Sequence, residues 1–182
     1  MRLRPSLLVL SVFVHLVTLS PCHLVTNAGE DTWKLFTSPA AGFAVKMPGL
    51  PIEQMQTVKT AAGNVEVHVF SVELEKPPVS YVVSYSALPE SAVKPGSEAK
   101  RLDNARDGAV ASTKGTLKSQ RRILLQNYPG RELEIDLPKE RRVRTRIYAV
   151  GNRLYQLLVI GPAGAKDATE AKRFLESFQL TK

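Results

Sequence analysis

The sequence predicts an α+β fold, a mainly antiparallel sheet with helices packed on it. Short runs rich in β-branched and aromatic residues recur along the chain, and turn residues such as Gly, Pro and Asn separate them. Two other segments repeat apolar residues at three- and four-residue spacing, which is typical of amphipathic helices. With 182 residues, 43% hydrophobic and 23% charged, the chain has the size and composition of one globular domain.

The first 28 residues have the pattern of an export signal. Arg2 and Arg4 precede an apolar stretch from Leu7 to Leu19, and the segment contains no acidic residue. The stretch is shorter than the roughly 20 residues of a membrane-spanning helix. Small residues at Thr26 and Ala28 predict cleavage after Ala28, which leaves one domain, residues 29–182, without a transmembrane helix.

A lipid anchor is the alternative interpretation of this segment. Leu19-Ser20-Pro21-Cys22 resembles the lipobox of bacterial lipoproteins, although Pro21 stands where a small residue is usual. Acylation would then make Cys22 the mature N-terminus. Both interpretations predict an exported protein, periplasmic or secreted. They differ in the mature N-terminus and in whether Cys22 holds the chain to a membrane.

Five strands are predicted in the first half of the mature domain. Phe43–Met47 alternates apolar side chains and ends at a Pro-Gly turn. Residues 61–64 have the composition of a hairpin loop between two of the strands, and the last strand is bounded by Pro77-Pro78. The predicted strands are Trp33–Phe36, Phe43–Met47, Glu53–Thr60, Val65–Leu74 and Val79–Ala87.

A helix is predicted next. Pro95-Gly96-Ser97 caps its start, Leu102, Ala105 and Ala109 recur at helical spacing, and Gly115 marks its end. Four more strands follow, the last two joined by a two-residue turn at Gly151-Asn152. They are Leu117–Leu125, Arg131–Leu137, Arg142–Val150 and Arg153–Ile160.

A second helix is predicted to start at Asp167, with Glu170 three residues later as in a capping box. Its apolar stripe is expected to dock on the sheet and consists of Ala171, Phe174, Leu175 and Phe178. Residues 154–160 are apolar on both faces of their strand, so helices are expected on both sides of the sheet centre.

Several phrases of the chain are similar to those of exported, uncharacterised bacterial proteins, and the order of elements resembles the Mog1/PsbP-like α/β/α sandwich. The phrases are Gly42–Gly49, Pro129–Glu132, Arg146–Tyr148, Gly151–Tyr155 and Phe174–Phe178. Members of that superfamily are mostly non-enzymatic binding or assembly factors, so the resemblance implies such a role. These phrases are turns and strand ends, and they transfer no functional residue.

Positive charge is concentrated in one segment of the mature domain. Residues 114–153 contain eleven bases and four acids. If the strands on either side of residues 138–140 form a hairpin, an even register places Asp136, Glu134 and Glu132 opposite Arg142, Arg144 and Arg146. Burial of the alternate apolar residues selects this register, because a one-residue slip would expose all of them. One interpretation is therefore a cross-strand charge ladder on a solvated face.

The other interpretation is an anion-binding surface, because the planar fork of Arg matches carboxylate or phosphate. It combines the bases that the ladder leaves unpaired with part of the ladder. The candidate residues are Lys118, Arg121, Arg122, Arg142, Arg144, Arg146 and Arg153. An unknown envelope protein or an anionic envelope component is the expected partner. Nucleic acid is not expected, because no nucleic-acid-binding motif accompanies the charge.

The sequence offers little for catalysis. After cleavage the chain contains no Cys and one His, His68, so neither a Cys nucleophile nor a Cys-rich metal site is available. No catalytic residue, metal site or cofactor is predicted, and an exported non-catalytic binding or assembly module is the leading hypothesis. The alternatives are a hydrolase that uses two carboxylates, as glycosidases do, and a purely structural envelope protein.

Overall fold

The computed structural model describes residues 33–60 and 63–181. The predicted signal peptide, the cleavage site after Ala28 and the lipidation site at Cys22 lie outside the described residues. The strands are β1 (Lys34–Ser38), β2 (Phe43–Met47), β3 (Ile52–Thr60), β4 (Gly63–Glu75), β5 (Pro78–Ala87), β6 (Thr116–Leu125), β7 (Tyr128–Leu137), β8 (Arg141–Val150), β9 (Arg153–Pro162) and β10 (Gln179–Leu180). The helices are α1 (Glu98–Thr113), α2 (Ala165–Glu176) and a 3-10 turn, η1 (Glu90–Ala92).

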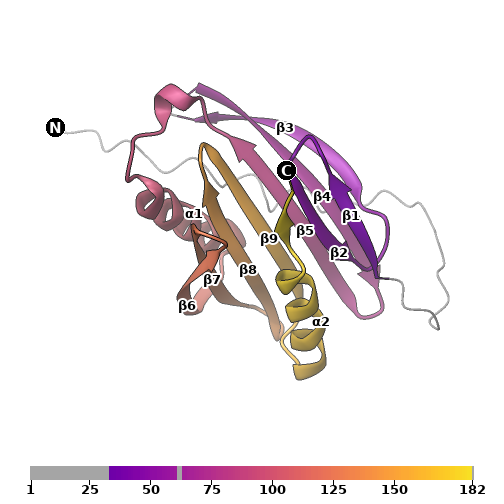
Figure 1. The fold of residues 1–182 in the computed structure, drawn as a ribbon. Coiled ribbons are helices and arrows are strands. Elements are labelled where there is room, and N and C mark those ends of the chain that lie inside the picture. The colour runs from indigo at the N-terminus through magenta and orange to yellow at the C-terminus, as the bar shows by residue number, and fades with distance from the viewer. Residues whose placement is uncertain (1–32, 61–62, 182) are drawn as a thin grey trace.

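Seven strands form one antiparallel sheet in the order β3-β4-β5-β9-β8-β7-β6 (Figure 1). The other three form a small antiparallel sheet, β1-β2-β10, beside α2. The predicted α+β class, a mainly antiparallel sheet with two helices, is confirmed. The separate small sheet and β10 are additional, because alternation along a strand predicts its faces and not its partners.

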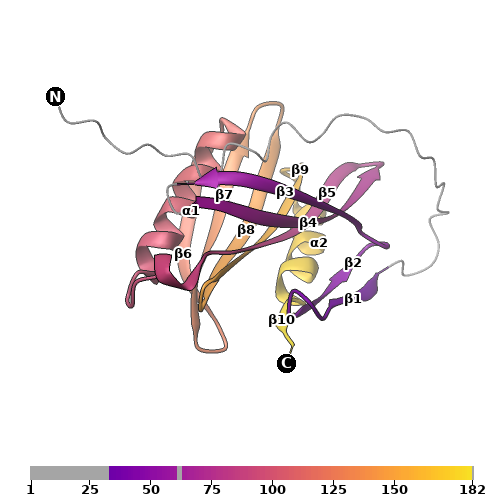
Figure 2. The ribbon, with the colours of Figure 1, turned by 90° about the horizontal axis from the view of Figure 1, so that it is seen from above.

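The large sheet is covered on both faces. α1 contributes Leu102 and Ala109 to apolar clusters, and Leu158 of β9 belongs to one of them. α2 and the small sheet pack in a different cluster that contains Phe174 and Leu157. Leu157 and Leu158 are consecutive in β9 and point to opposite faces. α1 and α2 therefore lie on opposite sides of the large sheet (Figure 2).

The predicted helix boundaries need two corrections. α1 begins after Ser97 as expected, but its left-handed C-cap is Lys114, with φ 51°, and not Gly115. Gly115 is needed for space, because a Cβ there would lie 2.5 Å from a side-chain carbon of Ile135. α2 begins at Ala165 after Gly164, so Asp167 lies inside the helix and the predicted capping box is wrong.

Candidate functional site

β7 and β8 pair in the register that the sequence predicts. Leu133, Ile135 and Val143 are fully buried on the α1 side of these strands. Because alternate residues point to opposite faces, burial of this apolar set places the charged set on the α2 side. Asp136, Glu134 and Glu132 lie opposite Arg142, Arg144 and Arg146. We call these six side chains the charge ladder.

The contacts of the charge ladder are shortest at its two ends. Arg142 Nε donates a hydrogen bond to Asp136 Oδ1 at 2.6 Å. Arg146 Nε donates to Glu132 Oε2 at 2.5 Å. The other oxygen of Glu132 lies 2.6 Å from Nη2 of Arg121 on the neighbouring strand β6. Both oxygens of Glu132 are therefore occupied by guanidinium groups.

The centre of the charge ladder is looser. Arg144 Nε lies 3.6 Å from Glu134 Oε1, and Arg142 Nη1 lies 3.7 Å from Glu134 Oε2. Two nitrogens of Arg144, Nε and Nη1, are buried and have no hydrogen-bond partner among the residues that the structure describes. The centre is therefore held by charge attraction rather than by hydrogen bonds of ideal length.

One interpretation of the sequence expected the charge ladder on a solvated face, but its arginines are mostly buried, while Glu134 and Asp136 are 33% and 45% exposed. The side chains of Arg142, Arg144 and Arg146 are only 15%, 8% and 14% exposed. The reason is that α2 lies on the same face. Arg144 Nη2 donates to the carbonyl of Ala163, just before α2, and Arg146 Nη1 donates to the carbonyl of Leu175, near its end. These arginines therefore join the sheet to both ends of α2.

Glu132 is held in its ionised form. Burial alone would raise the pKa of its carboxyl, but hydrogen bonds from Arg146 and Arg121 outweigh burial and lower the pKa below its ordinary value. A two-carboxylate hydrolase needs one carboxyl whose pKa is raised, so that it donates a proton near neutral pH. The pKa of Glu132 is shifted in the opposite direction, which argues against this residue as a catalytic acid.

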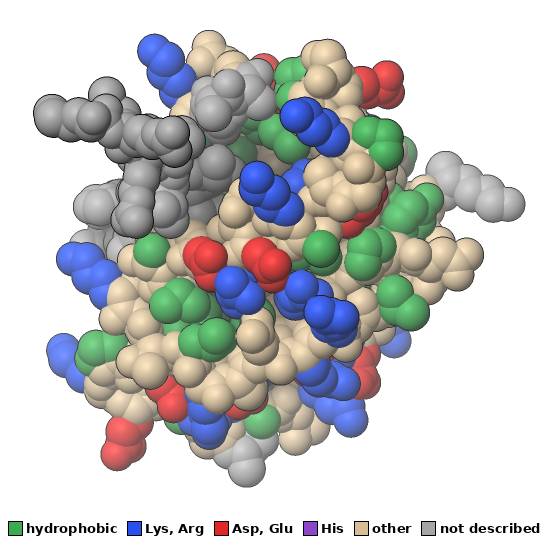
Figure 3. Space-filling model, turned by 90° about the vertical axis from the view of Figure 1, so that its left-hand side faces the viewer, with side chains coloured by type: hydrophobic (Ala, Val, Ile, Leu, Met, Phe, Trp, Pro, Cys, Tyr) green, Lys and Arg blue, Asp and Glu red, His purple; other side chains and the backbone are tan. Residues whose placement is uncertain are grey.

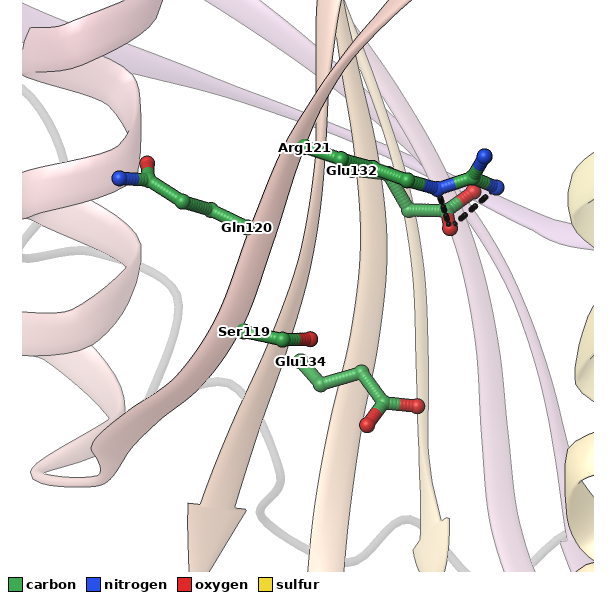
Figure 4. Close-up of a pocket in the computed structure, with 5 residues that line it drawn as sticks. All are labelled: Ser119, Gln120, Arg121, Glu132 and Glu134. Atoms are coloured by element: carbon green, nitrogen blue, oxygen red, sulfur yellow. Dashed lines mark hydrogen bonds and ion pairs between the residues drawn. The ribbon is translucent and has the colours of Figure 1, made fainter.

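An open depression of about 240 Å³ adjoins the charge ladder at the edge of the sheet. Its lining residues are Ser119, Gln120, Arg121, Glu132 and Glu134. Figure 4 shows that Gln120 points toward α1 and that the other four side chains point to the opposite side of the strands. The depression thus offers two carboxylates and one guanidinium that is already paired with Glu132. Its lining does not favour an anion.

The predicted anion-binding residues do not form one surface. Arg121, which the sequence left unpaired, bonds Glu132, and the three arginines of the charge ladder pair with its acids. Arg122 follows Arg121 on β6 and lies on the α1 side, opposite Arg131. Arg153 lies apart: its Nη1 donates to the carbonyl of Ala41 at 2.9 Å, and its guanidinium sits 5.8 Å from the Tyr85 ring centre.

Within residues 114–153, five exposed bases form no ion pair with any residue that the structure describes. Lys118 and Arg122 belong to the predicted set and lie on the edge strand β6, with Lys118 at a break in its register with β7. Lys114, Lys139 and Arg141 are additional, at the turns where β6 and β8 begin. We call these five residues the basic rim. Four of the five could be recognised in the sequence by their position, because bases at turns and bulges have no acid directly across a strand. The fifth, Arg122, lies within β6 opposite another base, Arg131.

α1 carries its own charge pairs. Arg131 of β7 and Arg106 of α1 both bond Asp103, and Arg106 also bonds Asp107 and Gln120. Figure 3 shows the side of the molecule with α1 and β6, where Lys and Arg side chains gather next to Asp and Glu side chains. These pairs attach α1 to the sheet and leave Arg122 of the basic rim outside them.

His68 lies in a different part of the large sheet. Its ring stacks on Tyr85 with the ring centres 4.7 Å apart, and its Nδ1 lies 3.4 Å from Glu53 Oε1. Within the described part of the chain, no group of three or more His, Cys, Asp or Glu side chains is arranged to hold a metal ion. No helix there is long and apolar enough to cross a membrane.

No protein-family model and no curated protein matches the chain. Among solved structures, it is similar to the solution structure of cyanobacterial PsbP (CyanoP) from Synechocystis sp. PCC 6803. The TM-score is 0.56 and the identity 14%, over 88% of this chain and 99% of that one. The chain therefore has a PsbP-like fold, as the resemblance in the sequence implies. A crystal structure of a protein of unknown function, PA94 from Pseudomonas aeruginosa, matches with a TM-score of 0.42 and 13% identity, over 76% of this chain and 88% of that one.

Replacing Glu132 with Gln tests the charge ladder. At neutral pH the change removes the charged acceptor of two arginines and is expected to lower the free energy of unfolding by about 1.5–3 kcal/mol. The lowered pKa of Glu132 stabilises the fold above the ordinary value of 4.5, and this stabilisation is lost as pH falls through the folded pKa. The difference between the native protein and Glu132→Gln should therefore shrink below about pH 4.5.

Chemical denaturation at about pH 7 and about pH 3 measures this difference. Glu140→Gln is the matched control, because Glu140 is exposed in the turn between β7 and β8. The control should change stability little at either pH. An effect of Glu132→Gln that is equal at both pH values, or no larger than that of the control, would contradict the prediction.

Proposed function

We propose that the protein is an exported, non-catalytic binding or assembly module of the bacterial cell envelope, which presents the basic rim to an anionic partner. Its PsbP-like fold supports a binding or assembly role in general. Helices on both faces of the sheet support the finer assignment to a Mog1/PsbP-like α/β/α sandwich. The observation that carries the proposal is the division of the bases into a paired charge ladder and an unpaired basic rim.

The two groups of bases differ in what they offer a partner. The arginines of the charge ladder are mostly buried and already bond carboxylates, so an anion would have to displace an acid to reach them. Lys114, Lys118, Arg122, Lys139 and Arg141 are exposed. A group of exposed, positively charged side chains attracts anions over about 10 Å at moderate salt. The basic rim therefore replaces the predicted set as the proposed contact surface.

Export is proposed from the N-terminal segment. Its basic start, apolar stretch of export-signal length and small residues before residue 29 support cleavage after Ala28. The partner is then a component of the envelope. An anionic lipid headgroup, a cell-wall carboxylate or phosphate, or an acidic protein face would each satisfy the chemistry of the rim.

Removing two bases of the rim tests the contact surface. Lys118→Gln with Arg122→Gln is expected to leave thermal melting unchanged, because both side chains are exposed. The variant should elute from immobilised anionic phospholipid vesicles at lower salt than the native protein. The matched control is Lys34→Gln with Lys46→Gln, which removes the same charge from two exposed positions of the small sheet.

The control should elute close to the native protein if the rim is the contact surface. Equal shifts for the two variants would mean that net charge alone determines retention. That outcome would overturn the assignment of the contact to the basic rim.

The N-terminus of the accumulated protein tests the export proposal. Mass spectrometry of the envelope fraction should find a chain that begins at Gly29, with 154 residues. Ala28→Leu should block cleavage and cause the precursor to accumulate, because the cleavage site needs a small residue. Cys22→Ser should leave the mature N-terminus unchanged. A diacylated Cys22 would support the lipid anchor instead, and an intact Met1 chain in the cytoplasm would contradict export.

A further inference from the structure

The large sheet has two edge strands of very different character. β6 is broken by a register shift between Leu117 and Ser119 and carries Lys118 and two arginines, features that discourage pairing with another chain. β3 runs for nine residues in unbroken register with β4 and contains no proline. Within the described part of the chain, no strand pairs with the outer side of β3, which Figure 2 shows at the rim of the sheet.

Most side chains of β3 are exposed, although Val58 is buried and Gln56 partly so. Met55 is 60% exposed and Ile52 is 67% exposed, and both are large and apolar. Glu53 is 59% exposed, and Lys59 is exposed without an ion pair to any described residue. An edge strand of this kind offers free backbone donors and acceptors at alternate residues, together with apolar contact area.

The sequence of β3 is complementary to itself. When two copies run antiparallel with full overlap, a two-fold axis passes through Gln56 and relates each residue to one on the other copy. Glu53 then lies opposite Lys59, and Met55 lies opposite Thr57. Glu53 and Lys59 are an even number of residues apart, so both point to the same face of the strand. The pairing therefore places two opposite-charge pairs symmetrically about the axis, and no like charges meet.

We infer that β3 is a self-association edge, at which a second copy of this chain adds its own β3 to continue the large sheet. The contact is isologous, because the same surface serves both copies and the two-fold axis closes the assembly. A single strand pair buries less area than a stable obligate interface does, so the dimer should be weak and concentration-dependent. Lys118 and Arg122 of the basic rim lie on β6, the opposite edge strand of the sheet, and remain free in the dimer.

Charge reversal at β3 tests the pairing by sedimentation of the exported protein over a wide concentration range. Glu53→Lys brings two lysines together at each charged pair of the dimer, and Lys59→Glu brings two glutamates together there. Each variant alone should therefore be monomeric where the native protein dimerises. Mixing the two variants creates opposite charges at both pairs and should restore dimers. This rescue separates pairing from any local effect of losing the contact between Glu53 and His68.

A cysteine on the axis tests the register. In a Cys22→Ser background, Gln56→Cys provides one thiol, which would meet its own copy at the 4.5–5.5 Å Cα spacing of opposite residues, within disulfide reach. Gln56→Cys should therefore form dimers on mild oxidation much faster than Gln120→Cys on the other edge strand. Monomers at all concentrations, no rescue on mixing, or equal oxidation of the two thiol variants would each overturn the inference. If the protein is monomeric at all concentrations, the binding partner of β3 would have to be a strand of a different protein.

Discussion

The pairing of β7 with β8 is the constraint on which the rest of the structure depends. Leu133, Ile135 and Val143 are completely buried against α1, and their burial fixes the register of the two strands. In the same register the alternate residues must point to the other face, so the acids of β7 and the arginines of β8 both face α2. The charge pattern on one face of the sheet thus follows from hydrophobic burial on the other face, and the charges themselves need only be compatible with it.

Because of this arrangement, a segment rich in basic residues is not by itself evidence of an anion-binding surface. Counted along the chain, residues 114–153 have a large excess of positive charge, which is typical of an anion-binding protein. In the folded chain, the arginines of the charge ladder pair with carboxylates, and two of them donate hydrogen bonds to backbone carbonyls at the two ends of α2. They connect layers of the fold. The exposed bases of this segment that form no ion pair with a described residue are those of the basic rim. At the opposite edge of the sheet, β3 is uncharged at its centre, and no described strand pairs with its outer side.

The sequence predicts those features that depend on alternation and on turn chemistry. The α+β class, the strands, the hairpin at Gly151 and the register of Glu134 with Arg144 all follow from local patterns, and the structure confirms them. The burial of the arginines of the charge ladder could not be predicted, because it depends on where α2, distant in sequence, lies on the sheet. The sequence also misplaces Arg121 and Arg153. Arg121 lies directly opposite Glu132 in the pairing of β6 with β7, a cross-strand pair that was not expected from the sequence, whereas the partner of Arg153 is the carbonyl of Ala41, which is distant in sequence. The sequence also misses the N-cap of α2. Asp167 matches the capping-box motif, but the N-cap residue is Gly164.

The central claim is that the arginines of the charge ladder belong to the framework of the fold and are not a binding surface. A double-mutant cycle between Glu132 and Arg146, with both residues changed to Gln singly and together, measures it most directly by chemical denaturation. The account predicts a coupling energy of about 1–3 kcal/mol, because the two side chains share a short, largely buried hydrogen bond. Additive effects, within about 0.3–0.5 kcal/mol, would show that Glu132 and Arg146 are not coupled in the folded chain and would contradict the account.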